Sequence, residues 1–158
     1  MESVAQVGGA GDDGIDVSAV WHRPDAAAAA DSCGDPVHVW AQCKALATKA
    51  STVHIRELEG VLLRVAQRLP HEHHLGMLIS SAGFSDPCLS YFHASSSSAM
   101  MALTLGYDDE LVEAHINRQA RAVFPDLVFA SLLDPQRRRL LAMVYYGVVL
   151  DTSLSPDV

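Results

Sequence analysis

Two stretches decide the fold: Ile15-Asp16-Val17-Ser18-Ala19-Val20-Trp21 and Val37-His38-Val39-Trp40-Ala41-Gln42-Cys43-Lys44. In both, side chains alternate with the period of two that predicts a half-buried β-strand. The odd positions form the apolar face of each strand. Asp16 lies on the opposite face of the first strand, and Gln42 and Lys44 lie on the opposite face of the second. If the two strands pair as an antiparallel hairpin, these three side chains converge on one side of a sheet.

Apolar periodicity predicts the elements that follow. A stripe at helical spacing predicts a helix from Ser51 or Thr52 to about Leu69, ended by Pro70. Short apolar runs predict buried strands at 75–82 and 99–105, and helices are expected at 85–95 and 111–124. The tail, 127–150, receives no assignment. The order of these elements indicates an α/β fold that opens with a β-hairpin.

Composition indicates one globular domain. The chain has 158 residues, of which 49% are hydrophobic and 19% are charged. We divide it into a Gly-rich N-terminal lip (1–14), an α/β core (15–130) with a low-complexity insertion at 24–36, and a C-terminal extension (131–158) that completes the domain. No apolar run reaches the ~18–20 residues of a membrane span, and no signal peptide is visible. Three cysteines without a C-x-x-C pattern favour a reduced, intracellular compartment.

The polar face of the predicted hairpin carries groups that suit metal-assisted phosphodiester hydrolysis. We expect Mg²⁺, with Mn²⁺ as a substitute, to be held by Asp16, the side-chain carbonyl of Gln42 and the backbone carbonyl of Cys43. Lys44 would orient the attacking water or stabilise charge on the phosphate. The chain has two lysines, Lys44 and Lys49, against nine arginines, so a compact ammonium at Lys44 is notable. A net charge of −8 argues against a protein wrapped in nucleic acid over its whole surface but allows a local site.

Several segments resemble known families. Gly8-Gly9-Ala10-Gly11-Asp12-Asp13-Gly14-Ile15-Asp16, followed by Val39-Trp40-Ala41-Gln42-Cys43-Lys44, resembles the G-G-x-G-D-x-G-I-D … x-Q-C-K signature of Mrr-like restriction endonucleases, members of the PD-(D/E)xK superfamily. Residues 53–60 and 76–84 also resemble that family. They are more similar still to fungal mitochondrial proteins described as required for respiratory growth. The resemblance covers residues 8 to 106.

The resemblance implies a restriction-endonuclease-like three-layer α/β/α sandwich around a mixed sheet. It implies a metal-dependent DNA endonuclease with Asp16, Gln42 and Lys44 as catalytic residues, a possible homodimer and a mitochondrial location. The residues expected at the DNA are Gly11, Asp12, Gly14 and Lys49. Relatives carry a helix, often with an acidic residue, before the Gly-rich loop, whereas seven residues precede Gly8 here. The alternative is therefore a non-catalytic nuclease-fold protein with a nucleic-acid-binding or mitochondrial assembly role.

Four other patterns have weaker functional interpretations. The segment 8–14 lacks the G-K-[ST] ending of a phosphate loop. The segment 71–74, His-Glu-His-His, could bind zinc, but adjacent loop histidines point in different directions, which favours a solvated turn. Arg137 to Arg139 could touch phosphates, although charge runs are more often solvated surface. Ser95 to Ser98 is expected to be a loop or helix end rather than a nucleophile.

Overall fold

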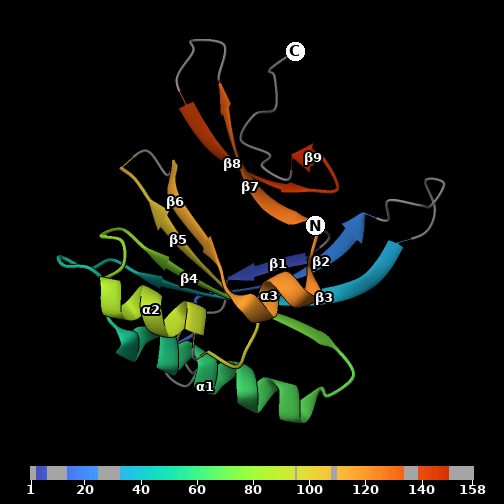
Figure 1. The fold of residues 1–158 in the computed structure, drawn as a ribbon. Helices are drawn as coiled ribbons and strands as arrows, with labels where there is room; N and C mark the ends of the chain where they lie inside the picture. The colour runs from blue at the N-terminus through green and yellow to red at the C-terminus, as the bar shows by residue number, and fades with distance from the viewer. Residues whose placement is uncertain are drawn as a thin grey trace.

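A six-stranded mixed sheet lies at the centre of the computed structural model, which describes residues 3–6, 14–24, 33–94, 96–107, 110–133 and 139–149 (Figure 1). Its strands follow each other in space in the order of the chain: β1 (Ser3–Gln6), β2 (Val17–Pro24), β3 (Cys33–Lys44), β4 (His73–Ser80), β5 (Met100–Leu105) and β6 (Leu111–Ile116). Strands β3, β4 and β5 run parallel, and the other neighbours pair antiparallel. The expected mixed sheet of an α/β fold is confirmed.

The opening hairpin forms as predicted but is longer. Strands β2 and β3 pair antiparallel, with Val17 opposite Ala41 and Trp21 opposite Val37. The pairing continues to Pro24 opposite Cys33, so the insertion expected at 24–36 is wrong at both ends. Its inner part, 25–32, lies outside the described residues. The strands extend because backbone pairing needs no particular side chain, and a proline is tolerated where a ladder ends.

The Gly-rich N-terminal lip at 1–14, for which no strand was expected, contains one. Residues Ser3–Gln6 form β1 and pair with β2, with Ser3 opposite Val20 and Gln6 opposite Val17. Without β1, the outer edge of β2 would expose unpaired N–H and C=O groups. Four residues give too short a pattern to be recognised as a strand from the sequence.

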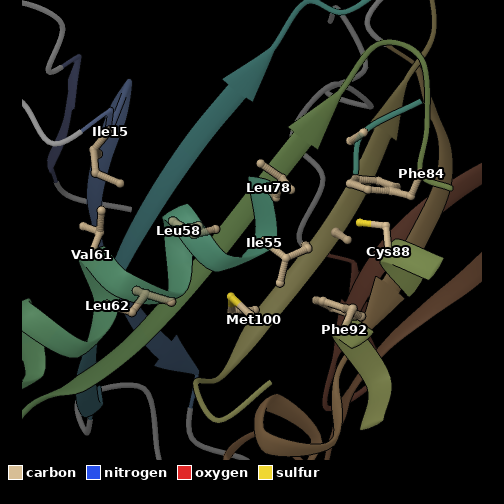
Figure 2. Packing of buried hydrophobic residues seen from close by; sticks show 12 residues of the cluster. Ile15, Ile55, Leu58, Val61, Leu62, Leu78, Phe84, Cys88, Phe92 and Met100 are labelled. Carbon is tan, nitrogen blue, oxygen red and sulfur yellow. The ribbon is translucent and has the colours of Figure 1, made fainter. Parts of the chain in front are cut away.

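Two helices cover one face of the sheet: α1 (Thr52–Arg68) and α2 (Asp86–Ala94) (Figure 1). Both match the predicted helices to within a residue or two. Figure 2 shows Ile55, Leu58 and Leu62 of α1 pointing towards Leu78 and Met100 of the sheet, all within one buried cluster. These contacts join α1 to the parallel strands and so fix the helix above the end of the opening hairpin.

The other face of the sheet differs from the expected α/β/α sandwich. It is covered by α3 (Arg118–Val123) and by a second sheet of β7 (Leu127–Leu133), β8 (Arg139–Tyr145) and β9 (Val148–Val149) (Figure 1). The aromatic rings of Trp21 and Tyr145 lie 5.1 Å apart in a second buried cluster. The third layer is thus mostly a sheet, and it begins before the C-terminal extension that was expected from residue 131. The resemblance implied helices there, and the tail has no period of two long enough to predict strands.

The helix expected at 111–124 is wrong in its first half. Residues Leu111–Ile116 form β6, which pairs with β5, and a helix of six residues begins only after Asn117. The polar spacing of Glu113 and His115 fits a strand as well as a helix. Pairing with the open edge of β5 therefore decides that the segment forms a strand. In the part of the chain that the structure describes, no helix is long and apolar enough to cross a membrane.

Candidate functional site

Asp16, Gln42 and Lys44 lie where β2 begins and β3 ends. The Asp16 N–H donates to the Ala41 carbonyl at 2.9 Å, which continues the β2–β3 register and places Asp16 beside Gln42. Lys44 follows two residues later, on the same side of the sheet. That side faces α1, because Trp40 on the same face packs into the helix-side cluster. The backbone therefore places these three residues together where β2 begins and β3 ends, and the convergence of their side chains and their chemical roles stay predictions.

The carboxylate of Asp16 is held against the end of β3. Its Oδ2 accepts a hydrogen bond from the Cys43 N–H at 2.6 Å. Burial and the nearby negative charge of Asp16 together raise the pKa of the Cys43 thiol. The expected contribution of Cys43 is its backbone carbonyl, and the structure adds that its N–H orients Asp16.

The amide of Gln42 is buried with an acceptor unused. Gln42 is 4% exposed, and its side-chain Oε1 has no hydrogen-bond partner among the described residues. A buried acceptor without a partner costs roughly 1–3 kcal/mol, so such a group needs an explanation. A cation ligand is one explanation, because an amide oxygen binds Mg²⁺ or Mn²⁺ readily. The residues present therefore fit a hard divalent cation.

Gly14 leaves space for the Gln42 amide. Its φ is +78°, and a Cβ at this position would lie 2.6 Å from Gln42 Nε2. Any other residue would strain the backbone and push the amide away. Gly14 was expected at the DNA backbone. The structure shows that Gly14 gives the Gln42 amide its space, and its expected place at the DNA stays a prediction.

Ile15 departs from the predicted faces. It lies in the helix-side cluster, near Val61 of α1 (Figure 2), whereas Trp21 lies in the cluster on the opposite face. The alternation fails here because β2 starts only at Val17, and the turn at Gly14 redirects the chain before it. As a result the segment that carries Asp16 is anchored on α1.

Lys44 has a partner that the sequence did not indicate. Its Nζ lies 3.7 Å from Glu57 Oε2, and the two side chains are 26% and 52% exposed. Glu57 lies off the apolar stripe of α1, where the spacing alone places a side chain in water. Only the position of α1 above the end of β3 reveals that this carboxylate belongs to the site. The helix position relative to the sheet is long-range information, which local spacing does not contain.

The other predicted nucleic-acid-binding residues divide into two groups. Gly11 and Asp12 lie outside the described residues. Lys49 is exposed in the loop between β3 and α1, at the same end of the sheet as Lys44. Arg139 opens β8, and Arg137 and Arg138 lie outside the described residues. Lys44 and Lys49 therefore provide two positive charges near the candidate site.

The histidine-rich segment begins as the expected exposed turn and enters β4 at His73, with contacts back to β3. Glu72 Oε2 lies 2.5 Å from His38 Nε2, and the Trp40 Nε1–H donates to His74 Nδ1 at 3.4 Å. His74 Nε2 also lies 3.0 Å from the Leu69 carbonyl, which uses both of its ring nitrogens. Among the residues that the structure describes, no three His, Cys, Asp or Glu side chains form a metal-binding group. The contacts of Glu72 and His74 hold the start of β4 against β3.

Comparison with known proteins places the chain by family. The family model described as "Required for respiratory growth protein 7" matches residues 27–107. The match includes β3, α1, β4, α2 and β5, and therefore Gln42, Lys44 and Glu57. No curated protein and no solved structure matches the chain.

Proposed function

The chain belongs to the Required for respiratory growth protein 7 family, and on that premise we propose that it supports respiratory growth in mitochondria as a nuclease-fold protein that binds nucleic acid without cutting it. Respiratory growth depends on mitochondria, which supports this location. The observation that carries the proposal is the gathering of Asp16, Gln42 and Lys44 at one end of the sheet, with Lys49 in the adjacent loop. Binding rather than hydrolysis is favoured because the matched family is described by respiratory growth and not by a nuclease activity.

The charge distribution supports a small footprint on nucleic acid. A chain with a net charge of −8 is repelled by phosphates over most of its surface, so binding depends on local cations. Lys44 and Lys49 meet this need at the end of β3. Removing one lysine that binds a phosphate should reduce the slope of log affinity against log salt by about 1. The expected affinity is modest and strongly dependent on salt.

A second candidate function is divalent-metal-dependent phosphodiester hydrolysis. The specific observation in its favour is the buried Gln42 Oε1 beside Asp16, which has no hydrogen-bond partner among the described residues. Asp16, Gln42 and the Cys43 carbonyl would hold Mg²⁺ or Mn²⁺, which supplies charge neutralisation at a phosphate. Asp16 is oriented by the Cys43 N–H, and Lys44, if released from Glu57, would face the same phosphate.

One set of proteins tests both candidates. Fluorescence anisotropy with labelled DNA in EDTA at ~50 mM salt should show binding by the wild type. We expect Lys44→Ala and Lys49→Ala to weaken it several-fold each, because each removes a cation that binds a phosphate. Arg68→Ala, at the far end of α1, is the control and should bind like the wild type. Absence of binding by the wild type would contradict the proposal.

Nicking of supercoiled plasmid in Mg²⁺ or Mn²⁺ decides between the candidates. The proposal expects no nicking above the level of Asp16→Ala. Nicking by the wild type that disappears in both Asp16→Ala and Lys44→Ala would establish the second candidate in its place.

A further inference from the structure

We propose that Glu57 is a ligand of a divalent cation at this site and that its ion pair with Lys44 is the cation-free state. The inference rests on the site described under the proposed function, and adds a helix residue to it. Asp16 and Gln42 come from the opening hairpin, whereas Glu57 comes from α1. The site would therefore bridge the sheet and the helix that covers it.

Gln42 is the residue that points to a cation. Its Oε1 is buried without a partner among the described residues, although the rest of the amide is closely packed beneath Gly14. Asp16 Oδ2 is only partly used, because one N–H donor leaves further lone pairs on the carboxylate. One carboxylate and one amide are few ligands for a cation. The Glu57 carboxylate, which lies close to Lys44, would supply the second negative charge that Asp16 and Gln42 lack.

The Lys44–Glu57 ion pair is weak enough to be exchanged. The atoms are 3.7 Å apart, and the Glu57 side chain is 52% exposed, so solvent screens much of the attraction. Exposed pairs of this kind contribute roughly 0–1 kcal/mol. A divalent cation attracts a carboxylate more strongly than one ammonium does. Binding of the cation would therefore draw the Glu57 carboxylate away from Lys44. The Lys44 ammonium would then be free to contact a phosphate.

The ligand chemistry selects a hard cation. Two carboxylates and one amide oxygen, completed by a backbone carbonyl and water, are the oxygen ligands that Mg²⁺ and Mn²⁺ prefer. All of these ligands are oxygen atoms, and none is the soft sulfur that would favour zinc. We therefore expect Mg²⁺ or Mn²⁺ at this site in preference to Zn²⁺.

Mn²⁺ titration followed by electron paramagnetic resonance, without nucleic acid, tests the inference. Glu57→Gln should weaken Mn²⁺ binding by at least about tenfold, the lower end of the loss seen when the environment of a metal site is changed. Lys44→Met should strengthen binding several-fold, because it removes the competing ammonium. Glu72→Gln is the matched control, since it removes a carboxylate that also faces a basic side chain, His38, in the middle of β3 and away from the site.

Weaker Mn²⁺ binding by Glu57→Gln together with stronger Mn²⁺ binding by Lys44→Met would establish the exchange. If the ion pair were purely structural, both variants would bind Mn²⁺ more weakly than the wild type. The inference is overturned if the wild type binds no Mn²⁺ at millimolar concentration, or if Glu57→Gln binds it like the wild type. Nucleic-acid binding in EDTA is independent of this result, so failure of the cation site and failure of the proposed function are distinguishable.

Discussion

Replacing Asn117 by alanine should lower the free energy of unfolding by about 3 kcal/mol, one of the two largest effects that we expect. Asn117 is fully buried, and its Oδ1 accepts from the backbone N–H groups of Ala120 at 2.9 Å and Met100 at 3.1 Å. Its Nδ2 donates to the Ser98 carbonyl at 2.7 Å. One side chain thus caps α3, joins β5 to the turn after β6 and holds the loop that precedes β5.

The loss in free energy of unfolding is large because alanine removes the helix cap and leaves the buried partners of Asn117 without hydrogen bonds. Loss of an N-cap costs ~1 kcal/mol, and each buried group left unpaired costs roughly 1–3 kcal/mol. Urea unfolding followed by circular dichroism measures the change. Arg118→Ala, an exposed neighbour in the same short helix, is the control and should stay within about 0.5 kcal/mol of the wild type. Equal stability of Asn117→Ala and Arg118→Ala would contradict this account.

Replacing Glu59 by alanine should cost about 2–3 kcal/mol, the second large effect. This carboxylate is 7% exposed, although it lies on α1. Oε2 accepts from the Tyr91 hydroxyl at 2.8 Å, and Oε1 accepts from the Ser97 N–H and hydroxyl at 2.5 and 2.9 Å. In the serine run expected as a loop or helix end, Ser96 and Ser97 thus donate to a buried carboxylate that ties α1 to the chain after α2.

The pH dependence of stability gives Glu59 a second signature. Burial alone would raise the pKa of Glu59, but the hydrogen bonds from Ser97, Tyr91 and Ser96 outweigh it and lower the pKa below its ordinary value. A carboxyl group with a lowered pKa in the folded state stabilises the fold above its unfolded pKa of about 4.3. That contribution disappears as the pH falls through the folded pKa. The wild type should therefore lose stability on acidification below about pH 4.

Urea unfolding between pH 3 and pH 7 measures this contribution. Glu59→Gln should be less stable than the wild type at pH 7 and should lose less stability on acidification. Glu57→Gln, the same change two residues earlier on the exposed side of α1, is the matched control when divalent cations are absent. Parallel pH profiles for the wild type and Glu59→Gln would rule out this role for Glu59.

Local pattern in the sequence predicted the elements that carry strong periodicity. The opening hairpin, α1, β4, α2 and β5 all follow from alternation or from an apolar stripe, because burial of one face dictates that spacing. The pattern also placed Asp16, Gln42 and Lys44 on one side of the sheet. It failed where pairing is decided by an open strand edge, as at Ser3–Gln6 and Leu111–Ile116.

The parts of the site that escaped prediction depend on contacts between distant residues. Glu57 looks like any exposed helix residue until α1 is placed above the end of β3. Gly14 looks like the end of a glycine-rich loop, yet its left-handed conformation is what gives Gln42 its space. Glu59 lies at helical spacing with Ile55 and Leu62, so its burial follows from the stripe, but its partners Tyr91 and Ser97 do not. In each case the role comes from tertiary packing, which local spacing does not encode.

Growth on a non-fermentable carbon source tests the central claim most directly. Cells whose only copy of the protein carries Lys44→Glu should fail to grow by respiration, because the substitution reverses the charge that we assign to nucleic-acid binding. Cells that carry Arg68→Glu, the same reversal at the far end of α1, should grow normally at equal protein level. Normal respiratory growth with Lys44→Glu would contradict the account.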